Sequence, residues 1–291
     1  MVGYPRREEP MDVLCIGMAT VDVIHYVDST PGSNEKYGAR QTNVYAGGPA
    51  ANAAITIAKL GGSAHLVSAF GCGALASVIR EELELYGVTY TDIAPNSAQT
   101  VIASVIVNIH TGDRTVVGVK PQHDQMEISV HPQACNPAAV LIDSYHTLAA
   151  VSCLEQISGT EAFVVLDGGS WKPRLAEVLR FVDYAVCSEH FLPPECSTLN
   201  EAAEYLHDQG IPFVCFTRGE RPIIVYQRGK SPFMFPVKHA QQVTDTLAAG
   251  DIFHGAFCLR MVSTNRDVMR SLAYASEVAA RSVRVSGPRD W

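Results

Sequence analysis

The stretch VTDTLAAGDIFHGAF, residues 243–257, combines residue types that suit phosphate transfer. Asp251 follows Ala248, Ala249 and Gly250 and opens an apolar run with helical spacing. The first amides of a helix lack internal partners, and the helix dipole favours an anion beside them. Small residues admit a bulky anion, and Asp251 could then take the proton of an attacking hydroxyl. A first-turn acid favoured only by the dipole fits the spacing equally well.

A glycine pair followed by a helix-start asparagine forms the second constellation, in YAGGPAANAA (45–54). Gly47 and Gly48 permit a tight turn or the close approach of a ligand. Asn52 can donate to a diol and accept from it at the same time. The alternative is an ordinary glycine turn with Asn52 as a local cap.

Three further polar residues follow predicted strands. Asp22 comes after the first strand, and an ionised carboxylate there could accept hydrogen bonds from two sugar hydroxyls. Asp167 ends a later strand in LDGGSWKP, and Lys172 could reach a phosphate. The alternatives are a solvent-facing acid for Asp22 and an ordinary helix-start lysine for Lys172.

A competing signal is the glycine pattern in FGCGALA. Gly71, Gly73 and Ala76 lie between a predicted strand and helix, and Asp92 follows near the spacing of a dinucleotide-binding fingerprint. That fingerprint normally opens the first strand–helix–strand unit of a chain, whereas another unit precedes it here. A nicotinamide-dependent dehydrogenase is therefore the weaker hypothesis.

Short apolar runs alternate with helical patterns along the chain, which predicts a mainly parallel sheet between helices. Tyr37–Tyr45 and Thr100–Val119 break this alternation, because each predicts strands without a helix between them, with HTGDR as a hairpin turn. They predict either a small β appendage or edge strands of the main sheet. Strands are expected at 13–17, 64–70, 138–143, 162–167, 184–188 and 213–219, and helices at 49–61, 75–87, 148–158, 172–182 and 199–210.

Composition limits the class of protein. The 291 residues are 47% hydrophobic, enough for one large core, and the net charge is -8 without a basic block. A nucleic-acid partner is therefore not expected, although one focused pocket could still bind a small anion. The eight cysteines form no C-x-x-C pair, and no apolar run approaches the ~20 residues that cross a bilayer. We expect buried free thiols and a soluble, cytoplasmic protein that binds no membrane.

Two of these motifs together resemble the ribokinase-like, or PfkB, carbohydrate kinases along almost the whole chain. They are GGPAANAAITIAKLGG near the start and DTLAAGD near the end. The resemblance implies a three-layer α/β/α core with a mainly parallel sheet and a small β lid. The kinase domain would span residues 11–291, with the lid from about 36–46 and 99–119, after an extension at 1–10.

The resemblance also implies roles for matching residues. Asp251 would be the catalytic base, and the anion hole for the transferred phosphoryl group would comprise Ala248, Ala249 and Gly250. Sugar hydroxyls would contact Asp22, Gly47, Gly48 and Asn52. ATP would contact Thr217 and Gly219 in FTRGE, together with Glu189 and Lys172. A monovalent-cation site would use Asp245 and Thr246.

The chain departs from the family pattern at several positions. Ala248 replaces the usual glycine, and its methyl group is small enough to leave the amides accessible. The N-x-x-E motif tied to magnesium reads Ser188-Glu189-His190-Phe191 here, so Glu189 is the remaining candidate for that role. Pro222 replaces the third glycine of the segment after Thr217.

We therefore expect ATP-dependent phosphorylation of a hydroxyl of a small sugar, of ketose or pentose type, with Mg2+ and a monovalent cation such as K+. A nucleoside kinase of the same fold and a non-catalytic sugar or nucleotide sensor are the alternatives. A homodimer through the lid is expected from the resemblance.

Overall fold

The computed structural model describes residues 12–94, 98–119 and 136–291. The predicted extension at 1–10 lies outside these residues. A nine-stranded sheet has the order β13-β12-β11-β10-β9-β8-β1-β4-β5. Among these strands β12 alone runs opposite to the other eight, pairing antiparallel with β11 and β13, so the predicted mainly parallel sheet is confirmed. The strands are β1 (Val13–Ile16), β4 (Ala64–Ser68), β5 (Thr89–Asp92), β8 (Ala139–Ile142), β9 (Phe163–Gly168), β10 (Tyr184–Ser188), β11 (Phe213–Arg218), β12 (Arg221–Gln227) and β13 (Phe233–Phe235).

The central strands are continuous apolar runs because both of their faces are covered. Every residue of β1, VLCI, and of β8, AVLI, is buried. Val13 of β1 pairs in parallel with Ala64 on one side and with Ala139 on the other. Such runs are typical of a parallel sheet that lies between two layers of helices.

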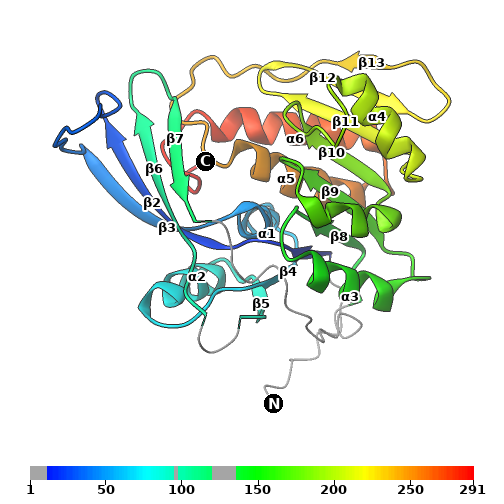
Figure 1. Ribbon diagram of the computed structural model, residues 1–291, viewed down its shortest axis with the longest axis horizontal. Coiled ribbons are helices and arrows are strands. Elements are labelled where there is room, and N and C mark those ends of the chain that lie inside the picture. Colours follow the sequence, from blue (N-terminus) through cyan, green and yellow to red (C-terminus); the bar gives the residue numbers. More distant parts are fainter. Residues whose placement is uncertain (1–11, 95–97, 120–135) are drawn as a thin grey trace.

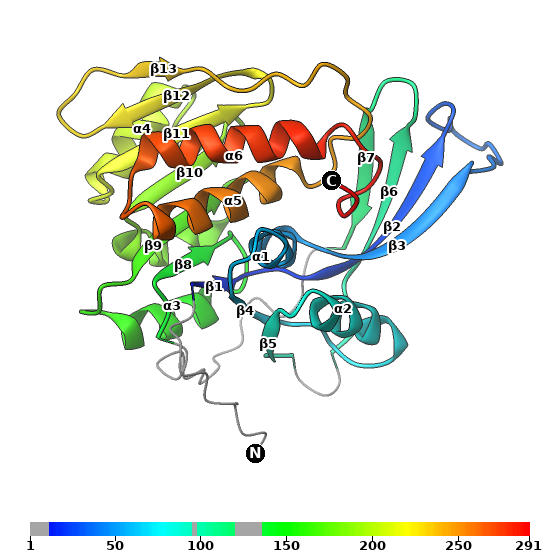
Figure 2. The same ribbon diagram turned by 180° about the vertical axis from the view of Figure 1, so that it is seen from behind.

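Helices cover both faces of this sheet. Figure 2 shows α1, α5 and α6 side by side across one face, and α2 packs into the same core. Figure 1 shows α3 and α4 on the other face. The α-helices are α1 (Pro49–Lys59), α2 (Ala74–Leu85), α3 (Thr147–Ile157), α4 (Leu199–Asp208), α5 (Ala249–Ser263) and α6 (Val268–Ser282).

One predicted helix is not an α-helix. The segment predicted as helical over 172–182 forms two short 3₁₀-helices, Pro173–Glu177 and Leu179–Phe181. Leu175, Val178 and Leu179 still point into the core, so the apolar spacing identified the buried face but not the type of helix.

A second sheet of four strands stands beside the first, in the order β3-β2-β6-β7. The strands are β2 (Thr20–Val27), β3 (Gln41–Gly47), β6 (Ile102–Asn108) and β7 (Arg114–Gly118). The HTGDR segment joins β6 to β7, and Asn108 Oδ1 accepts hydrogen bonds from the amides of His110 and Thr111 in this turn. We call these four strands the small sheet.

The sequence alone does not indicate that β2 belongs to this sheet. β2 follows β1 after only residues 17–19, so the two strands resemble one apolar segment when read from the sequence. Asp22 does follow the carboxyl end of β1, but it lies within β2, opposite Tyr45 of β3.

The described cysteines are free, and five of them are buried, whereas Cys72 is exposed and Cys196 is half-buried. Cys135 lies outside the described residues. Within the described part of the chain, no helix has the length and apolar character needed to cross a membrane.

Close contact between α1 and α5 depends on Gly255. A Cβ atom added at Gly255 would lie 2.6 Å from the carbonyl oxygen of Ala53 in α1. At Gly250, in the first turn of the same helix, an added Cβ would meet nothing within 4 Å. Gly250 is therefore a matched control for Gly255, because both lie in α5 but only Gly255 packs against α1.

We expect Gly255→Ala to lower the free energy of unfolding by about 1–3 kcal/mol because overpacking forces the two helices apart. Gly250→Ala should leave it unchanged or raise it, since alanine is the better helix former. Urea denaturation followed by circular dichroism measures both. Equal stability of the two variants would contradict the packing argument.

Candidate active site

The amino terminus of α5 presents free backbone amides beside a carboxylate. Ala248 precedes the helix in the left-handed region, with φ 59°. The amide of Ile252 donates to the carbonyl of Ala248 at 2.8 Å, and that of Ala249 to Thr246 at 3.3 Å. Within the described chain, the amides of Gly250 and Asp251 have no acceptor. These donors and the helix dipole suit an anion.

Asp251 is held by a residue far away in the sequence. Asn52, in the first turn of α1, donates from Nδ2 to Oδ2 of Asp251 at 2.7 Å. The two predicted motifs therefore meet at one hydrogen bond. Oδ1 of Asp251 is the oxygen that this bond leaves for the proton of a substrate.

Burial raises the pKa of Asp251 to about 7, from an ordinary value of 3.8. The carboxylate of Asp167 raises this pKa further, while Asn52, His254 and Arg114 lower it. A general base is most effective when its pKa lies near the working pH. Burial therefore gives Asp251 the proton affinity that such a base needs.

A buried acid–imidazole pair lies behind this carboxylate. Asp167, at the end of β9, and His254, in α5, are 6% and 4% exposed. Nδ1 of His254 lies 3.4 Å from Oδ2 of Asp167 and 2.7 Å from the carbonyl of Gly250, and Nε2 lies 2.9 Å from that of Val186. Burial raises the pKa of Asp167, and His254 opposes this rise. The pair fixes the first turn of α5 to the sheet edge.

The predicted sugar contacts lie at the junction of the small sheet with α1. Asp22 is 9% exposed and accepts a hydrogen bond from Thr20 Oγ1 at 2.6 Å. A Cβ at Gly47 would lie 2.1 Å from the Asp22 carboxyl group, so any side chain there would displace this carboxylate. Gly48 caps α1 with φ 90°, and a Cβ there would lie 2.5 Å from the carbonyl oxygen of Met18. Burial raises the pKa of Asp22, whereas Thr20 and Arg289 lower it.

The residues predicted to contact ATP gather at the ends of β10 and β11. The amide of Glu189 donates to the carbonyl of Thr217 at 3.0 Å, and Gly219 makes the turn into β12 with φ 62°. Oε2 of Glu189 forms an ion pair with Arg221. A contact between Glu189 and a magnesium–nucleotide complex stays a prediction, and Arg221 would have to share this carboxylate.

Lys172 lies at the neighbouring strand end and is held within its own loop. Its ammonium group donates to Ser170 Oγ at 2.5 Å and lies 5.2 Å from the centre of the Tyr145 ring. A contact between Lys172 and a phosphate stays a prediction.

The pair predicted to bind a monovalent cation is already surrounded by donors. Oδ1 of Asp245 accepts from the amide of Leu247, and Oδ2 accepts from Tyr26 and from the amide of Gly287. The guanidinium of Arg114 donates to both Oγ1 and the carbonyl oxygen of Thr246, at 2.6 and 2.8 Å. These oxygens do not fit a cation site as arranged here, because a positive group already occupies those of Thr246. We derive no step through K+.

Arg114 and Arg289 are charged residues of the site that the motifs did not reveal. Arg114 lies on β7 of the small sheet, and Arg289 follows α6 and is 5% exposed. Arg289 donates from Nη1 to Oδ1 of Asn52 at 3.0 Å. In the sequence these residues are visible only as the arginines of the segments GDR and GPRDW. Neither segment indicates which residues its arginine would contact.

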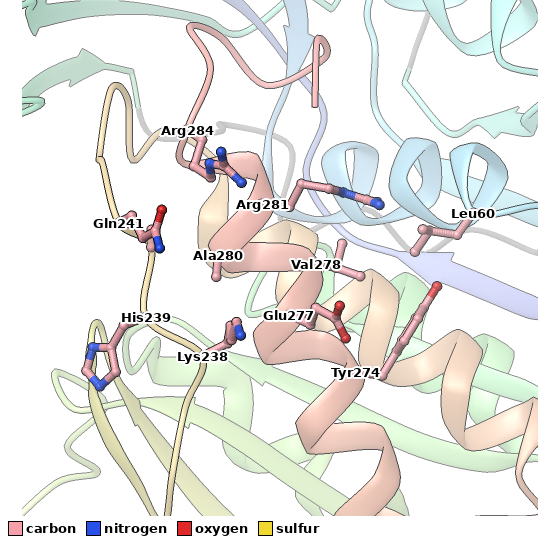
Figure 3. Close-up of a pocket in the computed structure, with 11 residues that line it drawn as sticks. Leu60, Lys238, His239, Gln241, Tyr274, Glu277, Val278, Ala280, Arg281 and Arg284 are labelled. Atoms are coloured by element: carbon pink, nitrogen blue, oxygen red, sulfur yellow. The ribbon is translucent and has the colours of Figure 1, made fainter.

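A separate cavity of about 480 Å3 runs along α6 (Figure 3). Lys238, Arg281 and Arg284 give it positive charge, and Glu277 opposes them. No residue that the sequence predicts for catalysis or binding lines this cavity.

The site combines features that suit a phosphotransferase: free helix-start amides, a neighbouring buried carboxylate, and polar residues at the edge of a second sheet. The model of the pfkB family of carbohydrate kinases matches residues 11–290, and the chain belongs to this family. It is 23% identical over 280 residues to ribokinase of Bacillus subtilis, which covers 94% of this chain and 92% of the relative. It is 22% identical over 254 residues to nucleoside kinase of Methanocaldococcus jannaschii, with 84% and 82% covered.

A solved structure supports the predicted three-layer ribokinase-like fold. Arabidopsis thaliana ribokinase complexed with ribose and ATP superposes with a TM-score of 0.77 at 23% identity, over 96% of this chain and 94% of that one. The prediction of an ATP-dependent phosphotransferase with an alcohol group as acceptor is confirmed by the family.

The dehydrogenase hypothesis is wrong, and the structure explains the pattern that suggested it. Gly71 has φ 82°, and a Cβ there would lie 2.8 Å from the carbonyl oxygen of Ala98. Asp92 pairs with Arg80 at 2.6 Å and accepts from the amide of Phe70. These residues close a turn and tie α2 to β5.

The raised pKa of Asp251 makes stability fall as pH rises. Between about pH 4 and pH 7 the folded protein holds a proton that the unfolded chain releases. The stabilisation is complete below the unfolded pKa and is lost as pH rises through about 7.

Asp251→Asn cannot ionise, so its unfolding free energy relative to wild type should be higher at pH 8 than at pH 5 by about 1 kcal/mol or more. Chemical denaturation at both pH values measures this difference. The exposed Asp208→Asn is the control and should show no such change. A pH-independent difference for Asp251→Asn would rule out the raised pKa.

Proposed function

We propose that this protein transfers the γ-phosphate of ATP to a hydroxyl of a small sugar, of ketose or pentose type. The observation that supports this most directly is the buried Asp251, with a pKa near neutrality, beside the free amides at the start of α5. The named ribokinase relatives favour a sugar as the acceptor.

Each residue has a defined part in the proposed reaction. Asp22 and Asn52 hold sugar hydroxyls, and Gly47 and Gly48 let the sugar approach the backbone. The acceptor hydroxyl gives its proton to Oδ1 of Asp251 while its oxygen bonds to the γ-phosphorus. The bond from that phosphorus to the ADP oxygen breaks, and the free amides of Gly250 and Asp251 stabilise the charge on the transferred group, whereas the amide of Ala249 already donates to Thr246.

ATP lies with its phosphates toward α5 in this proposal, and Thr217, Gly219 and Lys172 contact it. Mg2+, when bound with ATP, neutralises charge on the phosphates, and Glu189 is the residue that would face it. The small sheet closes over the sugar and keeps water from acting as a competing acceptor.

A test is ATP consumption measured over a panel of ketoses, pentoses and nucleosides. We expect turnover with at least one ketose or pentose. Turnover with nucleosides alone would make the protein a nucleoside kinase, as the archaeal relative is named. Binding of ATP and sugar without turnover would make it a sensor.

Asp251→Asn should lower kcat by about a hundredfold or more, because the proton has no acceptor. ATP affinity should change little, since Asp251 acts on the acceptor hydroxyl in this proposal. Asp208→Asn again serves as the control and should keep wild-type kcat. Turnover of Asp251→Asn within a few-fold of wild type would show that Asp251 is not the base.

We also propose a homodimer that forms through the small sheet. Val44 and Val117 are 47% and 66% exposed on strands β3 and β7. Sedimentation equilibrium should give twice the chain mass of 31.4 kDa, and Val117→Asp should shift the protein toward the monomer. A wild-type monomer at micromolar concentration would contradict this part of the proposal.

A further inference from the structure

The segment after α6 returns to the active site and inserts an arginine there. In both ribbon views the carboxyl end of the chain lies beside the junction of the two sheets (Figures 1 and 2). Lys59 of α1 donates to the carbonyl oxygens of Arg289 and Trp291 and lies 4.3 Å from the centre of the Trp291 ring. The amide of Gly287 donates to Asp245 at 3.0 Å. These contacts fix the backbone on both sides of Arg289.

The guanidinium of Arg289 is buried and bound to three different elements. Nε donates to Glu82 of α2 at 2.5 Å, and Nη2 donates to the carbonyl oxygen of Ala46 in β3 at 2.5 Å. Nη1 donates to Oδ1 of Asn52 in α1 at 3.0 Å. Glu82 also accepts from the amide of Ala46 at 2.5 Å. The arginine is therefore neutralised and oriented before any ligand binds.

This arrangement determines how the carboxamide of Asn52 points. A guanidinium can only donate, and an ionised carboxylate can only accept. With Oδ1 toward Arg289 and Nδ2 toward Asp251, both neighbours of Asn52 are satisfied. A flipped carboxamide would set donor against donor and oxygen against carboxylate.

We propose that Arg289 is a positioning residue: it locks Asn52 in the one orientation that donates to Asp251. Glu82 supports it by holding the guanidinium in place. This inference rests on the proposed function, because the catalytic benefit comes from an aligned base. Arg289 itself need not touch a substrate.

The titration of Asp251 distinguishes this role from a purely structural one. Other charged groups that act on Asp251 are Asp167 from β9, His254 from α5 and Arg114 from β7. Loss of Arg289 leaves all three in place. It frees Asn52 to turn away and removes a hydrogen bond that stabilises the ionised carboxylate, so the pKa of Asp251 should rise. A role limited to holding α2 against β3 would lower stability and leave this pKa unchanged.

The first measurement uses the wild-type protein and needs no turnover. Asp251 is labelled with 13C at its carboxyl carbon and assigned by comparison with Asp251→Asn. The side-chain amide signal of Asn52 should change with the same pH midpoint as that carboxyl. An Asn52 signal that does not follow the midpoint overturns the proposal.

The second measurement compares Arg289→Ala and Arg289→Lys with Arg180→Ala. Arg180 is an exposed arginine paired with Glu155, and its removal serves as the control. In folded Arg289 variants the carboxyl midpoint should rise by about half a pH unit or more. Their kcat should fall about tenfold or more, the effect of one charge-assisted hydrogen bond. Millimolar guanidinium should restore much of the kcat of Arg289→Ala and leave wild type and Arg180→Ala unchanged.

The possible results distinguish failure of the proposed function from failure of the positioning role of Arg289. An unchanged midpoint and wild-type kcat in folded Arg289→Ala overturn the positioning role. If wild type phosphorylates no member of the panel, the proposed function fails. The pH titrations of the Asp251 carboxyl in wild type and in the Arg289 variants then still decide the role of Arg289. If neither Arg289 variant folds, Glu82→Gln takes their place, because it removes the charge that holds the guanidinium; it should raise the Asp251 midpoint, and an unchanged midpoint would overturn the role of Arg289.

Discussion

The hydrogen bond between Asn52 and Asp251 is the contact on which the rest of the site depends. It joins the first turn of α1 to the first turn of α5, across almost two hundred residues of sequence. Asp251 would otherwise be a buried acid beside other acids. Its pKa of about 7 shows that burial and Asp167 together outweigh the bonds that favour ionisation, by a few kcal/mol. The site therefore keeps Asp251, the proposed base, partly protonated near neutral pH, at some cost to the stability of the fold.

The packing of the two helices makes this bond possible. Gly255 lets α5 approach the backbone of α1, and the His254–Asp167 pair fixes the same helix to the end of β9. Gly48 caps α1, and Pro49 is its first residue. Together they fix where the helix begins, and so they fix the side of its first turn on which Asn52 lies. Small residues and helix caps thus determine where the proposed catalytic groups lie.

Much of the fold could be predicted from sequence because its signals are local. Apolar runs indicated the parallel strands, and the glycine and proline positions indicated where α1 begins. The motif around Asp251 gave the helix start and its acid. β2 was missed because no turn residues beyond Gly17–Ala19 separate it from β1, and the 3₁₀ geometry at 173–181 was missed because its apolar spacing also fits an α-helix.

Arg289 and Arg114 could not be placed for a different reason. Each acts on the site through tertiary contacts with residues more than a hundred positions away. A single sequence carries no signal for such pairing. The hydrogen-bond donors around Asp245 and Thr246 could not be predicted for the same reason. They come from the small sheet and from the segment after α6, which are distant in the sequence.

The short connections between the two sheets have a mechanical consequence. The chain passes from β1 to β2 through residues 17–19 and from β3 to α1 through Gly48 alone. Any swing of the small sheet must therefore bend the chain at these two hinges. Since Gly48 is bonded to the first residue of α1, such a swing would also move the turn that carries Asn52. In the proposed reaction, enclosure of the substrate and alignment of the base would then be one movement.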